Sequence, residues 1–191
     1  MITYQSTRGS SKKLLFQDII LSGVAEDKGL YLPNSTSLEN LSYLTQEDLN
    51  YEDFVKTIFI ALDENSAKYV DDLSIYPGFE SSPTPTLKEI EENKYVMELF
   101  HGPTKSFKDY ALQPLGAIAD RRLGELGERG LVIVATSGDT GSAAIQSVKN
   151  SKNIDIVVLH PHNKVSEYQR RQMTEVIQDN VLNIAIEGSY D

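Results

Sequence analysis

The sequence of 191 residues contains no cysteine. Disulfide scaffolds, zinc–thiolate sites, iron–sulfur clusters and thiol nucleophiles are therefore excluded. Disulfides are characteristic of oxidising compartments, so their absence agrees with a reducing environment. On this ground we expect a cytoplasmic protein.

Long apolar runs are also missing. The first 13 residues are polar and lack the apolar core of a signal peptide. The longest apolar run, residues 131–135, is far too short to cross a bilayer. We therefore expect a soluble intracellular protein with no membrane partner.

Basic side chains are scarce relative to acidic ones, with 18 Lys and Arg against 28 Asp and Glu and a formal net charge of -10. A nucleic-acid backbone is bound through a surplus of Lys and Arg, so nucleic acid is not expected as the main partner. Hydrophobic residues make up 40% of the chain. This share is ordinary for a globular protein and is enough for one core or two small ones.

The first half of the chain has an irregular pattern. Apolar residues at spacings of three and four predict a helix over residues 51–63 with one face toward a core. Segments rich in glycine and proline predict loops. The other elements expected in this half are a helix at 12–22, loops at 23–33 and 76–85, and a strand at 95–100.

The second half alternates short apolar runs with helical patterns. Buried parallel strands are expected at 131–136, 154–160 and 181–187, with helices at 140–150 and 165–178. This β-α-β-α-β order is typical of a doubly wound parallel sheet of the α/β class. The change of pattern predicts a boundary that separates residues 1–129 from residues 130–191.

Residues 98–110 form the first segment that could carry catalytic chemistry, because a strand ends there, a turn follows and a helix begins. Ser106 is the expected N-cap, with Asp109 three residues later as a variant of the capping box. This register places Lys108 in the first helical turn, where the helix dipole disfavours a cation by roughly 0.3–1 kcal/mol. That position suits a nucleophilic amine, although a solvated surface lysine is the simpler interpretation of this segment alone. Three further residues are candidates for binding an anion or for ordinary loop positions: His101, Thr104 and Lys105.

Residues 135–144 form the second such segment, directly between a predicted strand and a predicted helix. Two glycines and four hydroxyl residues there leave backbone N–H groups free to hold a carboxylate or phosphate at a helix N-terminus. Any N-cap turn has a similar composition, but this one lies at the carboxyl end of a strand, where doubly wound sheets bind ligands. The spacing of Gly138 and Gly141 does not fit a dinucleotide fingerprint.

The histidines offer little sign of a metal site. His160 and His162 flank a proline after a strand, without a carboxylate at ligand spacing. We therefore expect no metal and interpret both as polar loop residues near a cleft.

Together these segments resemble the threonine synthase family, pyridoxal-phosphate enzymes with the fold of the tryptophan synthase β-subunit, known as fold type II. The resemblance consists of ordered, widely spaced matches at residues 4–9, 23–33, 100–109, 136–141, 164–166, 172–174 and 184–188. It implies that Lys108 forms the Schiff base with pyridoxal 5'-phosphate and is the catalytic base. It also implies that Asp139, at a position where the fold type usually has Asn, contacts the phenolic oxygen of the cofactor and shares one proton with it. The same resemblance implies that Thr136, Ser137 and Thr140 belong to the loop that binds the substrate carboxylate. Thr104 and Lys105 are the further substrate-binding candidates, and Lys105 departs from the apolar residue that the family often has there, adding positive charge near a phosphate.

The activity implied by the resemblance is the conversion of O-phospho-L-homoserine and water into L-threonine and phosphate, the last step of threonine biosynthesis. A threonine-synthase-like phospholyase and a non-catalytic ligand-binding fragment of the same fold remain alternatives. The glycine-rich phosphate loop of the family has no counterpart here, and the last predicted strand ends close to the C-terminus. We therefore expect the N-terminal part of a longer enzyme, with residues 1–129 in its larger domain and residues 130–191 beginning its smaller one. The oligomeric state stays open.

Overall fold

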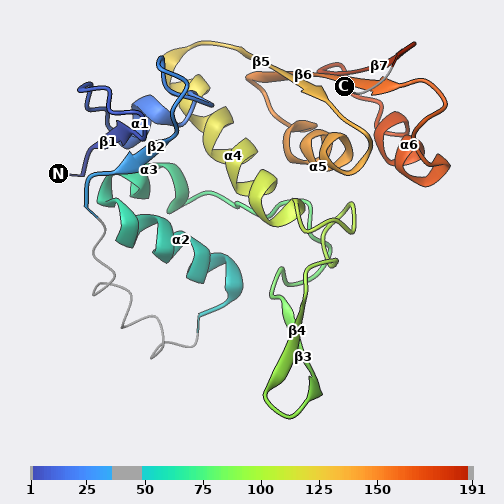
Figure 1. Cartoon of the computed structure of the whole chain (residues 1–191), viewed down its shortest axis with the longest axis horizontal. Coiled ribbons are helices and arrows are strands. Elements are labelled where there is room, and N and C mark those ends of the chain that lie inside the picture. Colours follow the sequence, from blue (N-terminus) through green and yellow to red (C-terminus); the bar gives the residue numbers. More distant parts are fainter. Residues whose placement is uncertain (1, 36–48, 189–191) are drawn as a thin grey trace. The chain divides into compact units, whose positions relative to one another are not determined.

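The structure, a computed structural model, describes residues 2–35 and 49–188. The chain divides into two compact units, Met1–Ser74 and Ile75–Asp191, and each is described by itself (Figure 1). The boundary expected near residue 130 lies inside the second unit. No helix within the described ranges is long and apolar enough to cross a membrane.

The first unit combines a small antiparallel sheet with short helices. Strands β1 (Tyr4–Ser6) and β2 (Tyr31–Pro33) pair with Gln5 opposite Leu32. The helical segments are α1 (Phe16–Ile19), α2 (Tyr51–Leu62), the 3-10 helix η2 (Glu64–Ser66) and α3 (Ala67–Val70). The helix predicted at 51–63 is confirmed as α2. Its N-terminus is capped by Asn50, whose side chain accepts a hydrogen bond from the N–H of Asp53 at 3.0 Å.

Two expectations for this unit are wrong in part. The helix expected at 12–22 is reduced to α1, because the backbone of Leu14 exchanges two hydrogen bonds with that of Tyr4, at 2.7 and 3.0 Å. This bridge holds the residues before α1 in extended geometry. The loop expected at 23–33 ends in strand β2, whose short sequence becomes a strand only through its pairing with β1.

The two N-terminal segments of the resemblance meet within this unit. The hydroxyl of Ser6 donates to Asp27 Oδ1 at 2.6 Å, and the N–H of Gly29 donates to the same oxygen at 3.0 Å. These hydrogen bonds, the one from Ser6 above all, hold the pKa of Asp27 below its ordinary value. A Cβ atom on Gly29 would overlap the Ser6 hydroxyl, so the close approach requires glycine.

A β-hairpin follows the loop at the start of the second unit. Strands β3 (Thr86–Glu91) and β4 (Lys94–Glu98) pair antiparallel, with Leu87 opposite Met97. The loop predicted at 76–85 is confirmed, and the strand predicted at 95–100 is confirmed as β4. Strand β3 was not predicted, because its sequence has only two apolar positions and both strands are exposed. Its strand geometry depends on the pairing with β4.

Helix α4 (Asp109–Leu126) contains a proline in its interior, Pro114. Proline has no N–H, so it cannot bond the carbonyl oxygen four residues earlier in a helix. That oxygen belongs to Tyr110, and it accepts a hydrogen bond from the hydroxyl of Tyr76 at 3.0 Å. The loop before the hairpin is therefore attached to the helix at the position where the helix lacks a bond of its own.

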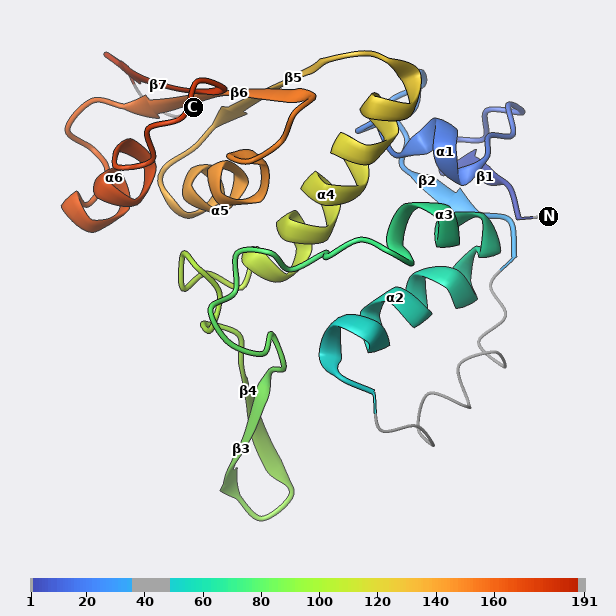
Figure 2. The same ribbon diagram turned by 180° about the vertical axis from the view of Figure 1, so that it is seen from behind.

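A three-stranded parallel sheet forms the centre of the second unit. Its strands lie in the order β5 (Gly130–Ala135), β6 (Ile154–Pro161) and β7 (Val181–Ile186), joined by α5 (Asp139–Val148) and α6 (Glu167–Thr174). The predicted β-α-β-α-β order is confirmed, and with it the mixed α/β class. Figures 1 and 2 show α5 and α6 on the same face of the sheet. The core under this face contains Leu123, Ile145, Ile156, Val158 and Met173.

The opposite face of the sheet is apolar and exposed in the described part of the chain. Leu131, Ile133 and Leu182 have exposed fractions of 60%, 64% and 54%. Among the described residues, helices thus cover only one of the two faces. The second helical layer of a doubly wound sheet is not formed by residues 2–35 and 49–188.

Candidate functional site

The two predicted segments form two turns of the second unit. We call residues 102–109, which lead into α4, the lysine turn, and residues 136–141, which lead from β5 into α5, the hydroxyl turn. Both turns end at the N-terminus of a helix. The hydrogen bonds that close the lysine turn come from a side chain of the following helix, whereas those that close the hydroxyl turn come from a side chain at the end of the preceding strand.

The lysine turn is closed by the carboxylate of Asp109. This side chain is fully buried and accepts the N–H and the hydroxyl of Thr104, each at 2.9 Å. Burial raises the pKa of Asp109, against the opposing effect of the two bonds from Thr104 and of the charge of Lys105. A Cβ on Gly102 would overlap the carboxylate, so the turn can close only over glycine.

Lys108 occupies the N-cap of α4 with helical backbone angles, φ −63° and ψ −23°. The expected N-cap, Ser106, is wrong, and so is the expected place of Lys108 in the first helical turn. The physical reason is that the Asp109 side chain bonds back to Thr104 and not to the N–H of the expected N-cap Ser106, so the helix begins two residues later than expected. The Lys108 amine lies 4.9 Å from the ring centroid of Phe107. Within the described ranges the amine has no ion pair.

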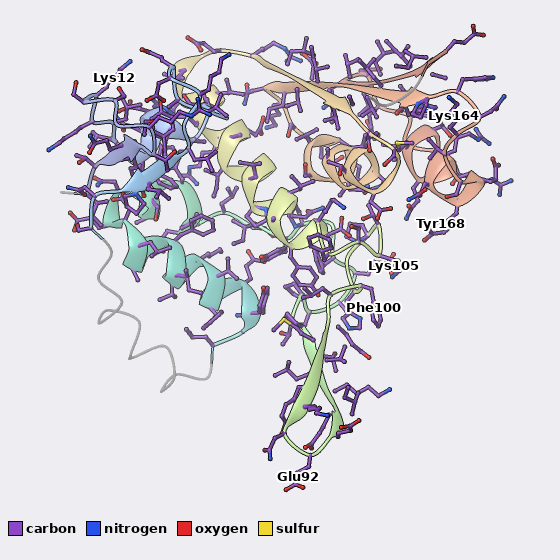
Figure 3. All side chains as sticks on the ribbon, viewed as in Figure 1. Lys12, Glu92, Phe100, Lys105, Lys164 and Tyr168 are labelled. Carbon is purple, nitrogen blue, oxygen red and sulfur yellow. The ribbon has the colours of Figure 1, made fainter. Side chains whose placement is uncertain are left out.

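Two other predicted residues of the lysine turn face different surroundings. Thr104 is 5% exposed, and its hydroxyl is directed at Asp109. Lys105 is exposed and has a left-handed backbone with φ 63°, a conformation that costs a side-chain-bearing residue of order 1–3 kcal/mol. Figure 3 labels Lys105 on this turn and Tyr168 on the helix next to it. Thr104 therefore faces the interior of the turn, whereas Lys105 presents its positive charge to solvent.

The hydroxyl turn is closed by Thr136, which is 2% exposed. Its oxygen accepts the N–H groups of Gly138 and Gly141, at 3.0 and 3.1 Å. The predicted ligand-binding hydroxyl of Thr136 is thus used inside the turn. The other predicted members, Ser137, Asp139 and Thr140, are exposed. The N–H groups of Asp139 and Thr140, in the first turn of α5, have no hydrogen-bond partner among the described residues.

Helix α6 bonds to both turns through two glutamines. Gln169 donates from Nε2 to Asp139 Oδ1 at 2.6 Å, and Gln172 donates from Nε2 to the Thr104 carbonyl oxygen at 2.8 Å. Residues three apart lie on one side of a helix, so one helix contacts the hydroxyl turn and the lysine turn together. Sequence reasoning missed Gln169. The available signal was a pair of amide side chains at helical spacing, directly after a predicted strand.

His101 directly precedes the lysine turn, and its Nε2 atom lies 3.4 Å from the Thr86 hydroxyl, whereas His160 and His162 belong to neither turn. His160 is 6% exposed and lies within β6, so its expected place in a polar loop is wrong; His162 is exposed beyond the strand. The Nδ1 atom of His160 and the Oδ1 atom of Asn183 are buried without a hydrogen-bond partner among the described residues. Both residues line a cavity of about 550 Å³ beside α6. The described part of the chain contains no group of three or more His, Asp or Glu side chains placed to hold a metal ion.

Comparisons with known proteins give one consistent result. The family model described as threonine synthase N terminus matches residues 3–69. The threonine synthase of Pseudomonas aeruginosa is 44% identical over 98% of this chain, which covers 41% of that protein. The threonine synthase of Saccharomyces cerevisiae is 35% identical over 98% of the chain and 40% of its own length. A threonine synthase-like 2 protein of Mus musculus is 36% identical, again over 98% of the chain and 40% of its own length.

Solved structures agree with these sequence comparisons. A threonine synthase of Brucella melitensis with bound PLP superposes with a TM-score of 0.89 and 35% identity, covering 100% of this chain and 42% of its own. The yeast threonine synthase superposes with a TM-score of 0.87 and 31% identity, covering 98% and 41%. The chain therefore matches the N-terminal portion of these proteins and spans about two fifths of the length of the relatives it matches.

Proposed function

We propose that this chain, which is similar over 98% of its length to the N-terminal portion of threonine synthases, supplies the cofactor lysine and part of the substrate site of such an enzyme. The reaction is the conversion of O-phospho-L-homoserine and water into L-threonine and phosphate by a cytoplasmic pyridoxal-phosphate lyase of fold type II. In this proposal residues 1–129 belong to the larger domain of the enzyme, and residues 130–191 begin the smaller one.

One observation carries the proposal: an amine and a set of anion-binding N–H groups lie on two turns that the same helix contacts. The amine is that of Lys108 at the N-cap of α4. The N–H groups are those of Asp139 and Thr140, and α6 bonds to both turns through Gln169 and Gln172. A phosphorylated amino acid and an aldehyde cofactor need such a combination of amine and anion-binding donors.

The residues present fit pyridoxal 5'-phosphate. Lys108 offers a primary amine without an ion pair in the described ranges, as covalent attachment to an aldehyde requires. Asp139 offers an exposed carboxylate, already oriented by a hydrogen bond, as the partner of the phenolic oxygen. When bound, the cofactor supplies an electron sink that stabilises carbanions of the amino-acid substrate.

The protein residues then have separate tasks. Lys108 would hold the cofactor through its amine, and the same amine would remove and return protons at the substrate carbons. Asp139 and the phenolic oxygen share one proton, because a carboxylate cannot donate a hydrogen bond as Asn does. Thr104 contributes indirectly, since its hydroxyl and N–H hold Asp109 next to Lys108.

Anionic ligands must be attracted by local groups, because the chain as a whole carries a formal charge of -10. The N–H groups of Asp139 and Thr140, at the positive end of α5, suit the substrate carboxylate. The exposed hydroxyls of Ser137 and Thr140 add donors to the same turn. The exposed cation of Lys105 suits the substrate phosphate.

The attachment of the cofactor is tested by borohydride reduction of the intact protein with pyridoxal phosphate, followed by mass measurement. We expect a reduced adduct on the wild type and its loss in Lys108→Ala. The matched control, Lys105→Ala, should keep the adduct while its KM for O-phospho-L-homoserine rises by about threefold to tenfold, the effect of losing one exposed cation. An adduct of equal yield on wild type and Lys108→Ala would contradict the proposal.

The products then distinguish the possible reactions. Threonine and phosphate released in equal amounts from O-phospho-L-homoserine support the synthase. Phosphate without threonine would identify a phospholyase, the closest alternative chemistry. An adduct without release of either product would identify a protein that binds the ligand and does not turn it over.

A further inference from the structure

Gln169 forms a short, oriented contact with Asp139. Its Nε2 atom donates to Asp139 Oδ1 at 2.6 Å. The amide cannot rotate freely, because the hydroxyl of Ser166 donates to its Oε1 atom at 2.8 Å. With Oε1 engaged as an acceptor, Nε2 is the end of the amide that faces the carboxylate.

The hydroxyl turn leaves room for this amide at Gly138. A Cβ atom built on Gly138 would lie 2.5 Å from the Gln169 Cδ atom, well inside contact distance. The same glycine has φ 149°, a conformation that residues with a side chain rarely adopt. Both the backbone and the missing side chain of Gly138 therefore allow Gln169 to lie against the turn.

Helix α6 is fixed independently of this contact. Gln172 donates from Nε2 to the Thr104 carbonyl oxygen of the lysine turn at 2.8 Å. At the next residue of the helix, Asn183 of β7 donates to the Met173 carbonyl oxygen at 2.9 Å. Because α6 is held to the lysine turn and to the sheet, Gln169 reaches Asp139 from a fixed position.

We propose that Gln169 is a positioning residue that orients Asp139 toward the phenolic oxygen of the cofactor, and that α6 fixes the hydroxyl turn relative to the lysine turn. The inference rests on the proposed function, since it concerns the same cofactor. The bond to Oδ1 leaves Oδ2 as the oxygen available to the cofactor.

The test compares the intact wild-type protein with Gln169→Leu, which keeps the size of the side chain and removes the donor. We expect an unchanged yield of reduced pyridoxal-phosphate adduct but a clear change in the visible circular dichroism of the bound cofactor, which reports the orientation of its ring. We also expect kcat to fall about tenfold, as for one lost hydrogen bond to a charged group, with KM changed less than about twofold. The control is Gln178→Leu, at an exposed glutamine beyond α6, which should match the wild type in all three measurements.

A double-mutant cycle separates positioning from general loosening of the fold. If Gln169 acts through Asp139, Gln169→Leu should add little to the effect of Asp139→Asn on circular dichroism and on kcat. If Gln169 only supports the fold, its effect should be the same in both backgrounds, and the inference would be overturned. Gln169→Glu gives a further check, because the introduced carboxylate repels Asp139 at neutral pH and its loss of kcat should exceed that of Gln169→Leu.

The possible failures are distinguishable. No adduct on the wild-type protein would overturn the proposed function and this inference with it. A normal adduct with circular dichroism and kcat unchanged in Gln169→Leu would overturn the inference alone.

Discussion

The two turns of the candidate site perform the same structural task with different chemistry. In the lysine turn a carboxylate from the helix, Asp109, reaches back to bind Thr104. In the hydroxyl turn a hydroxyl at the end of the strand, Thr136, reaches forward to bind Gly138 and Gly141. The first turn depends on a buried ionisable group, and the second on a buried neutral one.

This difference predicts different sensitivities. A neutral hydroxyl has no protonation state to change near neutral pH, so the hydroxyl turn should hold its shape at any moderate pH. A buried carboxyl must desolvate its charge when it ionises, so the stability of the lysine turn should depend on pH. The lysine turn, which contains Lys108, is thus the turn whose closure should depend on pH.

The largest effect is expected at Thr136. Thr136→Val keeps the shape of the side chain but leaves the buried N–H groups of Gly138 and Gly141 without their acceptor. The free energy of unfolding, measured by urea titration, should fall by about 3 kcal/mol. Thr140→Val, at an exposed position of the same turn, should cost less than about 0.5 kcal/mol. Similar values for the two variants would show that Thr136 does not close the turn.

A somewhat smaller loss is expected at Gly102. In Gly102→Ala the new methyl group overlaps the Asp109 carboxylate, so the lysine turn must open or shift. We expect a loss of about 2 kcal/mol in the free energy of unfolding and a lower yield of the reduced cofactor adduct. Gly23→Ala is the control, since nothing lies within 4 Å of its Cβ position. Wild-type stability in the Gly102→Ala variant would contradict this prediction.

The pH dependence of Asp109 gives the next, more gradual effect. Burial raises the pKa of Asp109 in the folded state above its unfolded value. Its contribution to stability is therefore fully present below the unfolded pKa and is lost as pH rises through the folded pKa. In urea titrations across the acidic range, the wild type should lose stability relative to Asp109→Asn as pH increases. A difference between the two proteins that is constant with pH, or that changes in the opposite direction, would refute this.

The smallest effect is expected at Ser106. The sequence pattern marks it as an N-cap, which would make Ser106→Ala cost about 1 kcal/mol. In the structure the N-cap is Lys108. The Ser106 hydroxyl oxygen lies 3.4 Å from the backbone nitrogen of Lys108, which is long for a hydrogen bond. We therefore expect a loss below about 0.5 kcal/mol in thermal or urea unfolding. A loss as large as that of a true N-cap would mean that the hydroxyl caps the helix in solution.

The regular part of the fold could be predicted from the sequence because its signals are local. The apolar runs of β5 and β6 and the spacing in α2 are visible within one window of residues each. Strands β2 and β3 could not be predicted in this way, because their sequences become strands only beside β1 and β4.

For the candidate site, the sequence showed which residues could react, but it did not show which residues form hydrogen bonds with them. Lys108 and Asp139 stand in segments whose composition already pointed to an amine and to an anion-binding turn. The bond from Gln169 to Asp139 joins residues 30 positions apart, and that from Gln172 to Thr104 joins residues 68 apart. His160 shows the same limit, since its burial depends on the face of β6 that α6 covers.

The sequence alone thus determined the order of strands and helices in the second half of the chain and the chemical groups offered by the two turns. These properties follow from local periodicity and residue type. Only the tertiary structure decided which polar groups form the hydrogen bonds that close the turns and which remain available to a ligand. Thr104 and Thr136 are directed inward, while Lys108 and the N–H groups of Asp139 and Thr140 have no such partner in the described residues. The reason is that a hydrogen bond needs a partner at a fixed distance and angle, and packing of the helices on the sheet sets both.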